Sequence, residues 1–515
     1  MRGTAAQVVL LCVSLPAIVL SGLRWLRVAQ REHYLVGSVL RFARRWWSLG
    51  PNRLLGGAGV VGLVGAAFGI LPGGVVASLA VLCGPLGLPV RGRSSPLTWT
   101  RRLRTLAAIT AVVAAAPIVM GAAAGLWLAA DVSALVAIAV PLLVEAGLAL
   151  TAPLEQRLAR PYVERATARL RATAPRVVAI TGSYGKTSTK GYVAHLLGGT
   201  FSVVPSPRSF NNQAGLARAV NDHLVPGTEV FVAEMGTYGP GEIARMCEWI
   251  RPEIAVITAI GPVHLERRGG EERIAAAKAE ILDRASVAVL NVDHPLLAAL
   301  AAEAAAAGRP VRRCSARDAS ADVWVRAEGA DLAVFVGGAG EPLATVAGLD
   351  AAPTNVACAV AVAVELGVPP SAIAERLAGL PTAAHRREVT ATQGGAAVID
   401  DTYNANPAGA AGALDLLVRM SSPQARRVVV TPGMVELGGR QDEENERFAR
   451  DAAAVATDIV VVGHTNARSL LGGARSGGAR VVRAATREQA VAWVSANVGP
   501  GDVVLYENDL PDHFP

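Results

Sequence analysis

The sequence predicts an α-helical transmembrane region followed by two α/β domains, each built on a doubly wound, mainly parallel sheet. Three observations lead to this fold class. The first third of the 515-residue chain holds apolar runs of about the length that spans a bilayer. From residue 176 onward, short β-branched segments alternate with alanine-rich helical segments. These segments form two series, one before and one after about residue 386, which indicates two separate sheets.

Composition and pattern divide the chain into four parts. Residues 1–152 form the membrane region, and residues 153–175 form a charged helical connector. The first α/β domain takes residues 176–385, and the second takes residues 386–515. A chain of this length is too long for one core, so three or so folding units are expected.

Five apolar runs in the membrane region are each near the ~20 residues that cross the hydrocarbon as a helix. They are residues 5–26, 54–71, 74–90, 106–130 and 132–152. Arginines gather between the first and second runs and between the third and fourth, whereas the connections at Leu71–Gly74 and at Asp131 carry no positive charge. Arginines collect in cytoplasmic loops. We therefore expect a multi-pass protein of the plasma membrane with its N-terminus outside and both α/β domains in the cytoplasm.

Charge is unevenly distributed. Residues 1–175 hold eighteen arginines and five acidic residues, a net charge of +13, whereas the rest of the chain carries −6. Because the arginines flank apolar runs, they indicate membrane topology and a bilayer partner, and no nucleic-acid surface. The five cysteines include no CxxC pair, which argues against a disulfide framework and a zinc site.

Two features of the membrane region suggest a function. The stretch GAGVVG at residues 57–62 fits GxGxxG, but it lies in an apolar run with no preceding strand, so helix packing is the favoured interpretation. Glu145 is the single acidic residue in the last run, and carboxylates inside a membrane often have a function. It also lies near enough to the cytoplasmic end to reach water, so it is assigned no role.

The stretch VAITGSYGKTSTK at residues 178–190 predicts a phosphate-binding loop between a strand and a helix. Its spacing, TGxxGKT, is shorter than the common P-loop. Lys186 would contact the β- and γ-phosphates of a nucleotide, and the hydroxyl of Thr187 would complete a Mg²⁺ shell. A glycine turn without a ligand is the alternative. The other residues assigned to the nucleotide here are Thr181, Gly182, Ser183, Gly185 and Ser188.

Six motifs, taken together in this order and spacing, resemble the Mur ligases. They are TGSYGKTSTK (181–190), EMGTYGPGEI (234–243), IGPVHLE (260–266), AKAEI (277–281), NVD (291–293) and DDTYNANP (400–407). They are most similar to the branch that adds D-alanyl-D-alanine to a UDP-muramoyl tripeptide. The resemblance covers residues 176 to about 505 and implies a central ATP-binding domain followed by a Rossmann-like C-terminal domain.

The resemblance also implies the chemistry. Mur ligases use ATP and Mg²⁺ to activate a substrate carboxylate as an acyl phosphate, which the amine of an amino acid or dipeptide then attacks. Such a reaction depends on holding anionic groups together and offsetting their charge. The family likeness assigns Glu234 to Mg²⁺, His264 to a second Mg²⁺ and Lys278, when carbamylated, to the same metal. From the residues alone, capping of a helix is the less favoured alternative for Glu234, and His264 could be a core or capping histidine.

Further positions take their roles from the same resemblance. Asn291 matches the asparagine that reads adenine, and Arg386 matches the arginine of the linker that approaches the phosphates when the domains close. Here His385 replaces the usual glycine of that linker. Asp401 would contact the ribose. Tyr403, Asn404 and Asn406 would hold nucleotide or amine, with an Asx-rich turn as the alternative.

The sequence departs from the dipeptide-adding branch at three places. Thr354, Asn355 and Cys358 replace the usual HNxxN stretch, and the chain closes on YENDLPDHFP without a glycine-serine-arginine run. A membrane region also stands where the UDP-sugar-binding domain is expected. The carboxylate acceptor is therefore either a small molecule or lipid-linked.

Three function classes are compatible with the sequence. The first is an ATP-dependent ligase of peptidoglycan or other cell-envelope precursors. The second is a poly-γ-glutamate or folylpolyglutamate-type ligase, which the motifs EMGTYGPGEI and DDTYNANP disfavour. The third is a membrane transport ATPase, which would need the longer Walker loop and a further signature segment.

Overall fold

The computed structural model contains two compact units. One comprises Met1–Leu158 and Leu510–Pro515, and the other comprises Ala159–Asp509. The structure describes residues 4–68, 72–92, 96–207, 210–237, 239–261, 270–329, 331–349, 351–381, 388–391, 394–402, 405–510, 513 and 514.

The first unit is helical. Its helices are α1 (Thr4–Arg31), α2 (Ser38–Ser48), α3 (Gly50–Ala67), α4 (Pro72–Cys83), α5 (Arg101–Ala124) and α6 (Leu126–Thr173), the last of which continues into the second unit. Among the described residues, three helices are long and apolar enough to cross a membrane, namely α1, α5 and α6. Helices α3, with 18 residues, and α4, with 12, are not among these three, and the count of five spans stays a prediction.

The break between the last two apolar runs lies at Gly125 rather than at Asp131. Helix α5 ends before Gly125, and α6 starts at Leu126, so Asp131 lies inside a helix. Glycine is a poor helix former, which explains a break at this position. Asp131 lies in the second turn of α6.

Helices α3 and α4 pack closely through a glycine of the GAGVVG stretch. A Cβ at Gly62 would lie 2.6 Å from the backbone oxygen of Gly73 in α4. No larger residue fits at this crossing without moving one helix. The stretch therefore lies at a helix-helix contact, of the kind that small residues allow in membranes.

Glu145 of α6 holds the start of helix α2. Its carboxylate accepts hydrogen bonds from the backbone N–H groups of Gly37 and Leu40, the latter at 3.2 Å. The first N–H groups of a helix have no partner inside the helix, and a negative charge there is stabilising. The carboxylate that the sequence left without a role thus caps an amphipathic helix rich in arginine and tryptophan.

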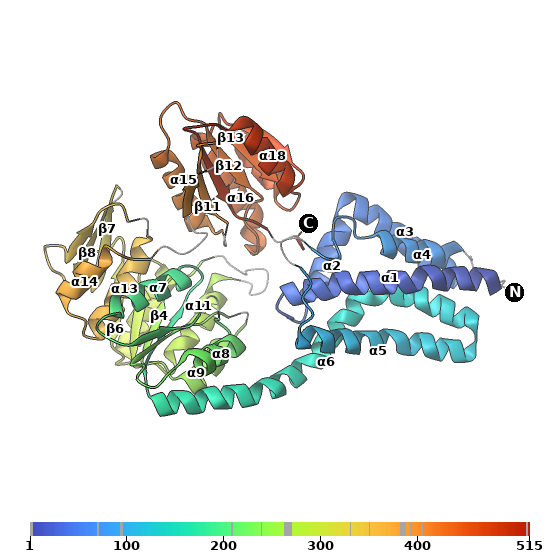
Figure 1. The fold of residues 1–515 in the computed structure, drawn as a ribbon, viewed down its shortest axis with the longest axis horizontal. Coiled ribbons are helices and arrows are strands. Elements are labelled where there is room, and N and C mark those ends of the chain that lie inside the picture. Colours follow the sequence, from blue (N-terminus) through green and yellow to red (C-terminus); the bar gives the residue numbers. More distant parts are fainter. Residues whose placement is uncertain are drawn as a thin grey trace. The chain divides into compact units, whose positions relative to one another are not determined.

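The first sheet of the second unit has the order β2-β3-β1-β4-β5-β6-β7-β8-β9. The pairs β7–β8 and β8–β9 are antiparallel, and the other neighbouring pairs are parallel. Strands β4, β6, β7 and β8 of this sheet are labelled in Figure 1. Its strands are β1 (Arg176–Thr181), β2 (Val203–Pro205), β3 (Val230–Glu234), β4 (Ile254–Ile257), β5 (Val287–Asn291), β6 (Val311–Ser315), β7 (Val323–Glu328), β8 (Asp331–Val336) and β9 (Ala344–Val346). Its helices are α7 (Lys186–Leu197), α8 (Gln213–His223), α9 (Glu242–Ile250), α11 (Glu271–Ala279), α12 (Pro295–Ala306), α13 (Pro353–Glu365) and α14 (Pro370–Leu377), with a 3₁₀ turn η1 (Glu280–Leu282).

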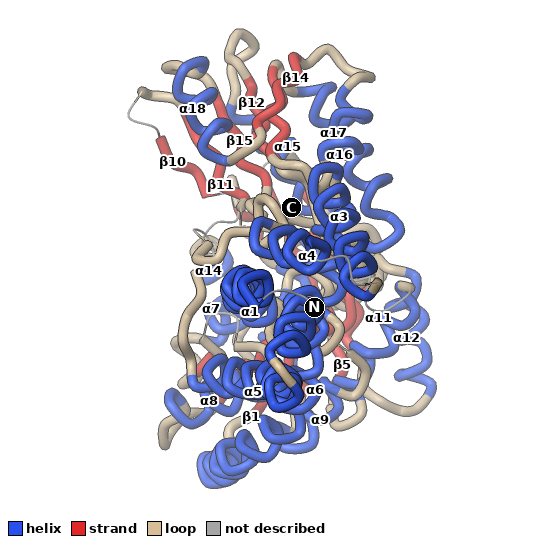
Figure 2. Tube along the Cα trace, turned by 90° about the vertical axis from the view of Figure 1, so that its right-hand side faces the viewer, coloured by secondary structure: helices blue, strands red, loops and turns tan. Residues whose placement is uncertain are grey.

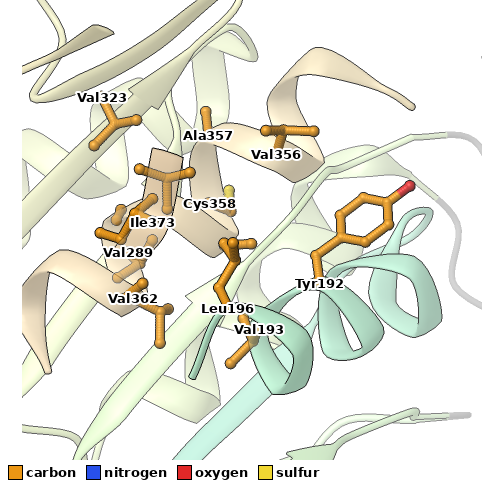
Figure 3. Close-up of a cluster of buried hydrophobic side chains, with 14 of the residues drawn as sticks. Tyr192, Val193, Leu196, Val289, Val323, Val356, Ala357, Cys358, Val362 and Ile373 are labelled. Carbon is orange, nitrogen blue, oxygen red and sulfur yellow. The ribbon is translucent and has the colours of Figure 1, made fainter. Parts of the chain in front are cut away.

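Alternate side chains of the strands fill two cores, one on each face of this sheet. Val178 and Ile180 of β1 join the core that α7, α13 and α14 cover. Figure 3 shows Leu196 and Val193 of α7 directed toward Cys358 and Val362 of α13 in this core. Val177 and Ala179 join the opposite core with α8, α9 and the end of α6. Burial on both faces accounts for the near-continuous apolar strands in the sequence.

The second sheet has the order β10-β11-β15-β12-β13-β14, with only β10 antiparallel among the described strands. Its strands are β10 (Glu388–Ala391), β11 (Ala397–Asp401), β12 (Arg427–Thr431), β13 (Asp458–Val462), β14 (Arg480–Ala484) and β15 (Val503–Glu507). Its helices are α15 (Pro407–Met420), α16 (Gln441–Val455), α17 (Ala467–Ala474) and α18 (Arg487–Asn497), with a 3₁₀ turn η2 (Gly438–Arg440). Helices α16 and α17 pack side by side (Figure 2). Helices α15 to α17 cover one core and α18 the other.

Candidate active site

The phosphate loop follows β1 and leads into α7, as the sequence predicts. Gly185 precedes α7 with φ of 79°, a left-handed conformation that favours glycine. A Cβ there would also lie 2.2 Å from Oδ1 of Asn355 in α13. The loop is therefore held tightly between the sheet and α13, with the free N–H groups at the start of α7 facing the carboxyl end of β1.

Two hydroxyl side chains fix the loop to the neighbouring strand. Ser183 Oγ donates to the carbonyl of Gly261 at 3.2 Å and accepts the N–H of Gly261 at 3.1 Å. Thr258, just after β4, donates its hydroxyl to the carbonyl of Tyr184. The side chain of Ser183, which the sequence analysis assigns to the nucleotide, thus stabilises the loop.

Lys186, at the start of α7, folds back over the loop. Its Nζ donates to the carbonyl oxygens of Gly182 at 2.7 Å and Ser183 at 3.4 Å. Ser188 lies in the first turn of the same helix, and Thr181 ends β1 with a buried hydroxyl that has no hydrogen-bond partner among the described residues. A lysine in this position places a positive charge at the mouth of the loop, where phosphate oxygens would lie.

Glu234, at the end of β3, is the centre of a buried polar cluster. Its Oε2 accepts from Thr187 Oγ1 and lies against Lys190 Nζ, each at 3.0 Å, and its Oε1 accepts from Asn211 Nδ2 at 3.2 Å. The side chains of Lys190 and Glu234 are 7% and 2% exposed. A buried carboxylate needs such partners, because an unpaired charge away from water is strongly unfavourable.

The Thr187 hydroxyl and the Glu234 carboxylate form a donor set that suits Mg²⁺. This ion prefers oxygen ligands and keeps several water and phosphate oxygens, so one or two protein ligands suffice. Oε2 of Glu234 lies within 3.0 Å of Thr187 Oγ1, so both oxygens face the same point. No group of three or more His, Cys, Asp and Glu side chains that could hold a metal gathers within the described part of the chain.

Asn291 and Lys278 lie on elements next to this edge of the sheet. Asn291 ends β5, where its Nδ2 donates to the carbonyl of Thr258 at 2.8 Å and its Oδ1 accepts the N–H of Asp293 at 3.1 Å. Lys278 lies in α11 and is 5% exposed, which is unusual for a lysine.

Four residues assigned from the sequence lie outside the described residues. They are His264, Arg386, Tyr403 and Asn404. Their roles remain predictions.

In the second domain, polar groups follow the ends of adjacent parallel strands. Asp401 ends β11, and its carbonyl accepts the N–H of Asn508 at 3.1 Å. Asn406 caps α15 by accepting the N–H of Gly409 at 3.0 Å, which is the turn-forming role that the sequence left open. Glu507, which ends β15 opposite Asp401, is fully buried and accepts the hydroxyl of Thr431 at 2.6 Å. Burial raises the pKa of Glu507 to about 8, and the nearby Asp401 charge adds to the rise.

The loop after β12 is held by the amide side chains of three asparagines, of which Asn445 and Asn466 are buried. Asn445 accepts the N–H of Met434 and donates back to its carbonyl, at 2.7 and 2.8 Å. Asn466 donates to the carbonyls of Pro432 and Met434, at 2.9 and 3.0 Å, and Asn508 donates to Gly433 at 2.6 Å. A loop held at each carbonyl in this way is a rigid wall at the carboxyl edge of the sheet, where open α/β sheets bind their ligands.

Sequence reasoning missed several residues of these clusters. Lys190 lies within the quoted motif TGSYGKTSTK, and its burial beside Glu234 could have been suspected from that spacing. Asn211, Thr258 and Glu507 gave no such signal, because their partners are distant in the sequence.

Comparison with known proteins then decides the family. The family model "Mur ligase middle domain" matches residues 180–363, and "Mur ligase, glutamate ligase domain" matches residues 385–506. The UDP-N-acetylmuramoyl-tripeptide--D-alanyl-D-alanine ligase of Mycobacterium tuberculosis (strain ATCC 25618 / H37Rv) is 34% identical over 367 residues, which cover 64% of this chain and 69% of that protein. The chain belongs to the Mur ligase family.

Other relatives agree with this assignment. The enzyme of the same name from Bacillus subtilis (strain 168) is 29% identical over 308 residues, covering 58% of this Mur ligase and 63% of that protein. Among solved structures, the MurF ligase of Thermotoga maritima in complex with ADP is similar with a TM-score of 0.57 and 26% identity, covering 68% of this chain and 80% of that one. MurF from Acinetobacter baumannii shares the fold, with a TM-score of 0.58 at 24% identity over 68% of this chain and 77% of its own. The two family models match residues 180–363 and 385–506, so the helical first unit lies outside both matches.

Proposed function

We propose that this Mur ligase is an ATP-dependent amide ligase of peptidoglycan precursor synthesis, which activates a carboxylate as an acyl phosphate and joins it to an amine. The observation that carries the proposal is the phosphate loop with Lys186 at its mouth and the Thr187–Glu234 pair beside it. Family membership and the names of the relatives support the same activity.

Each residue of the loop has a task in this reaction. The N–H groups at the start of α7 bind the phosphate oxygens, and Lys186 leaves the loop carbonyls to offset the charge that develops on the transferred phosphoryl group. Thr187 and Glu234 would hold Mg²⁺, which supplies further charge neutralisation when bound. Lys190 and Asn211 keep the Glu234 carboxylate in a fixed orientation.

The substrates follow from the branch of the family. The names of the relatives support a UDP-muramoyl peptide as carboxylate acceptor and a dipeptide such as D-alanyl-D-alanine as amine. The alternative of a lipid-linked acceptor, which the membrane region suggests, has no support in these comparisons. The rigid loop after β12, with Asp401 and Asn508 beside it, forms the wall that would receive the amine.

The localisation is part of the same proposal. Helices α1, α5 and α6 have the length and composition of membrane spans, and the arginines that flank them favour a cytoplasmic ligase. This placement gives the ligase access to ATP.

The test is a ligation assay with purified full-length protein, ATP and Mg²⁺, in which UDP-muramoyl tripeptide and D-alanyl-D-alanine are added together or singly. We expect ADP release that needs both substrates, and an amide product of the matching mass. Lys186→Ala should abolish the product, whereas Arg218→Ala, which removes one exposed i,i+4 ion pair, should leave the rate unchanged. Amine-independent ADP release, or product formation by the Lys186→Ala variant, would refute the assignment.

A further inference from the structure

The residues that follow the ligase unit do not belong to that unit. After β15, residues Leu510–Pro515 belong to the first unit together with Met1–Leu158. The ligase unit is therefore inserted between two parts of the first unit. Helix α6 connects it to the preceding part, and the residues after Asp509 connect it to the following part. We call residues 510–515 the closing segment.

Polar groups of the first unit bind the described residues of the closing segment. His513 Nε2 lies 3.2 Å from Glu32 Oε1, and both side chains are about 5% exposed or less. The other carboxylate oxygen of Glu32 accepts from Arg41 of α2 at 2.8 Å. Trp46 of α2 donates its indole N–H to the carbonyl of His513 at 3.0 Å. A buried histidine beside a paired, buried carboxylate indicates a built contact, since buried carboxylates need such partners.

Aromatic contacts add to these hydrogen bonds. The rings of Phe514 and Phe42 meet edge to face, with centroids 5.0 Å apart and an interplanar angle of 81°. Phe42 also contacts the His513 ring at 5.2 Å. The guanidinium of Arg45 lies 5.7 Å from the centroid of Phe514. Phe514 packs against the buried cluster that forms the core of the first unit. Edge-to-face rings and a cation over a ring are favourable geometries, so residues 513 and 514 are recognised by shape as well as by charge.

We propose that Glu32 and helix α2 form a peptide-binding site whose ligand is the closing segment of this same chain, and that it fastens the ligase unit to the first unit at a second point, independent of α6. The site recognises a histidine and the phenylalanine that follows it. Because the ligand is covalently attached, its effective concentration at the site is high, and a modest intrinsic affinity is enough to keep the site filled.

The test separates the two attachments. A protease recognition sequence is inserted after the exposed Leu158 of the full-length protein, which carries an affinity tag at its N-terminus and is purified in detergent. After cleavage, the fragment beginning at Ala159 has lost its link through α6. We expect it to remain bound to the tagged first unit, and to be released when a synthetic peptide with the sequence of residues 507–515 is added in excess. The same peptide with alanine in place of its histidine and phenylalanine should release none.

Two variants decide the role of the site. The double variant His513→Ala/Phe514→Ala should dissociate at least tenfold faster after cleavage. Trp99→Ala, which removes an exposed aromatic ring from the same unit, should behave like the parent. Circular dichroism and ATP-dependent ligation before cleavage check that the double variant is folded. Release of the fragment from the parent protein, or equal retention by the double variant, would overturn the proposal.

Discussion

At the scale of single residues, the molecule uses buried charges in pairs. Lys190 and Glu234 are both almost fully buried and 3.0 Å apart, whereas Arg176 and Glu253, at 2.7 Å, are each about 40% exposed. When one residue of a buried ion pair is removed, the other charge stays away from water without compensation. When one residue of an exposed pair is removed, water solvates the charge that remains. Distance alone therefore says little about how much an ion pair matters.

Lys190→Met should lower the free energy of unfolding of the ligase unit by about 3 kcal/mol, because it leaves the Glu234 carboxylate buried without its cation. Arg176→Met serves as the matched control and should cost less than about 1 kcal/mol. Urea denaturation of both variants without nucleotide measures the two values. Equal costs would show that burial of the Lys190 pair does not set its contribution.

Glu507 should make the stability of the second domain depend on pH. Its pKa is about 8 in the folded protein against an ordinary value of 4.5, so the folded state holds a proton that the unfolded state has released. The stabilisation of the folded state by this bound proton is fully present below about pH 4.5. It is lost as pH rises toward 8, at up to about 1.4 kcal/mol per pH unit. Glu507→Gln should lack this fall and be the more stable protein above pH 8. Urea midpoints at pH 6 and pH 9 compare the two, and parallel changes would contradict the assignment.

At the scale of elements, the sequence predicted the central strands well and the edges poorly. The predicted segments became β1, β3, β4, β5, β11, β12, β13 and β15. They are residues 176–180, 229–236, 253–261, 286–293, 396–401, 426–434, 458–464 and 502–508. Strand β1 is one residue longer than its segment, and the other seven strands are shorter than theirs. Strands β2, β6 to β10 and β14 were missed, and most of them are short or partly exposed and lack a long apolar run.

Some residues of the candidate site could be predicted from the sequence and others could not. The phosphate loop and Glu234 could be placed from local sequence, because a strand, a glycine turn and a helix follow one another directly. The partners of Glu234 could not, because Asn211 comes from a segment 23 residues away and is brought in by the pairing of β2 with β3. Glu145 likewise needed the structure, since its partners lie 105 and 108 residues earlier in the chain.

Gly185→Ala should weaken nucleotide binding at least tenfold, because the new Cβ would meet Asn355 and the left-handed backbone would be strained. Gly308→Ala has nearly the same φ, +80°, with nothing within 4 Å of the added Cβ, so it isolates the backbone strain. It should cost about 1 kcal/mol of stability and leave ADP affinity unchanged. Calorimetric titration with ADP measures the affinities. Wild-type affinity in Gly185→Ala would show that the loop tolerates a side chain.

The last turns of α6 should behave as part of the ligase core. Leu170 is 6% exposed and packs in the core beneath β1, whereas Leu158 on the same helix is 47% exposed. Leu170→Ala should lower the stability of the ligase unit by about 3 kcal/mol, and Leu158→Ala by less than about 0.5 kcal/mol. Thermal unfolding of the two variants checks this, and similar melting temperatures would place the helix outside the core.

At the scale of the whole molecule, the described parts of the candidate site lie within residues 159–509, the second unit. A fragment of those residues should therefore keep ATP-dependent ligation of the UDP-linked acceptor within about threefold of the full chain, since no described site residue is lost. Initial rates at saturating substrate compare the two proteins. A correctly folded fragment with less than a tenth of the activity would assign a substrate-binding role to the first unit.

Glu145 links two remote parts of the polypeptide. Its carboxylate secures the first turn of α2, and the far end of that helix presents Trp46 and its neighbours to the closing segment. Replacing Glu145 would destabilise the first turn of α2, which begins over a hundred residues earlier in the chain. Through α2, it would also weaken the contact with His513, more than three hundred residues later in the chain. Contacts that lie before and after the ligase unit in the chain thus both depend on this carboxylate, so its replacement should weaken the attachment of His513 and leave the residues of the candidate active site in place.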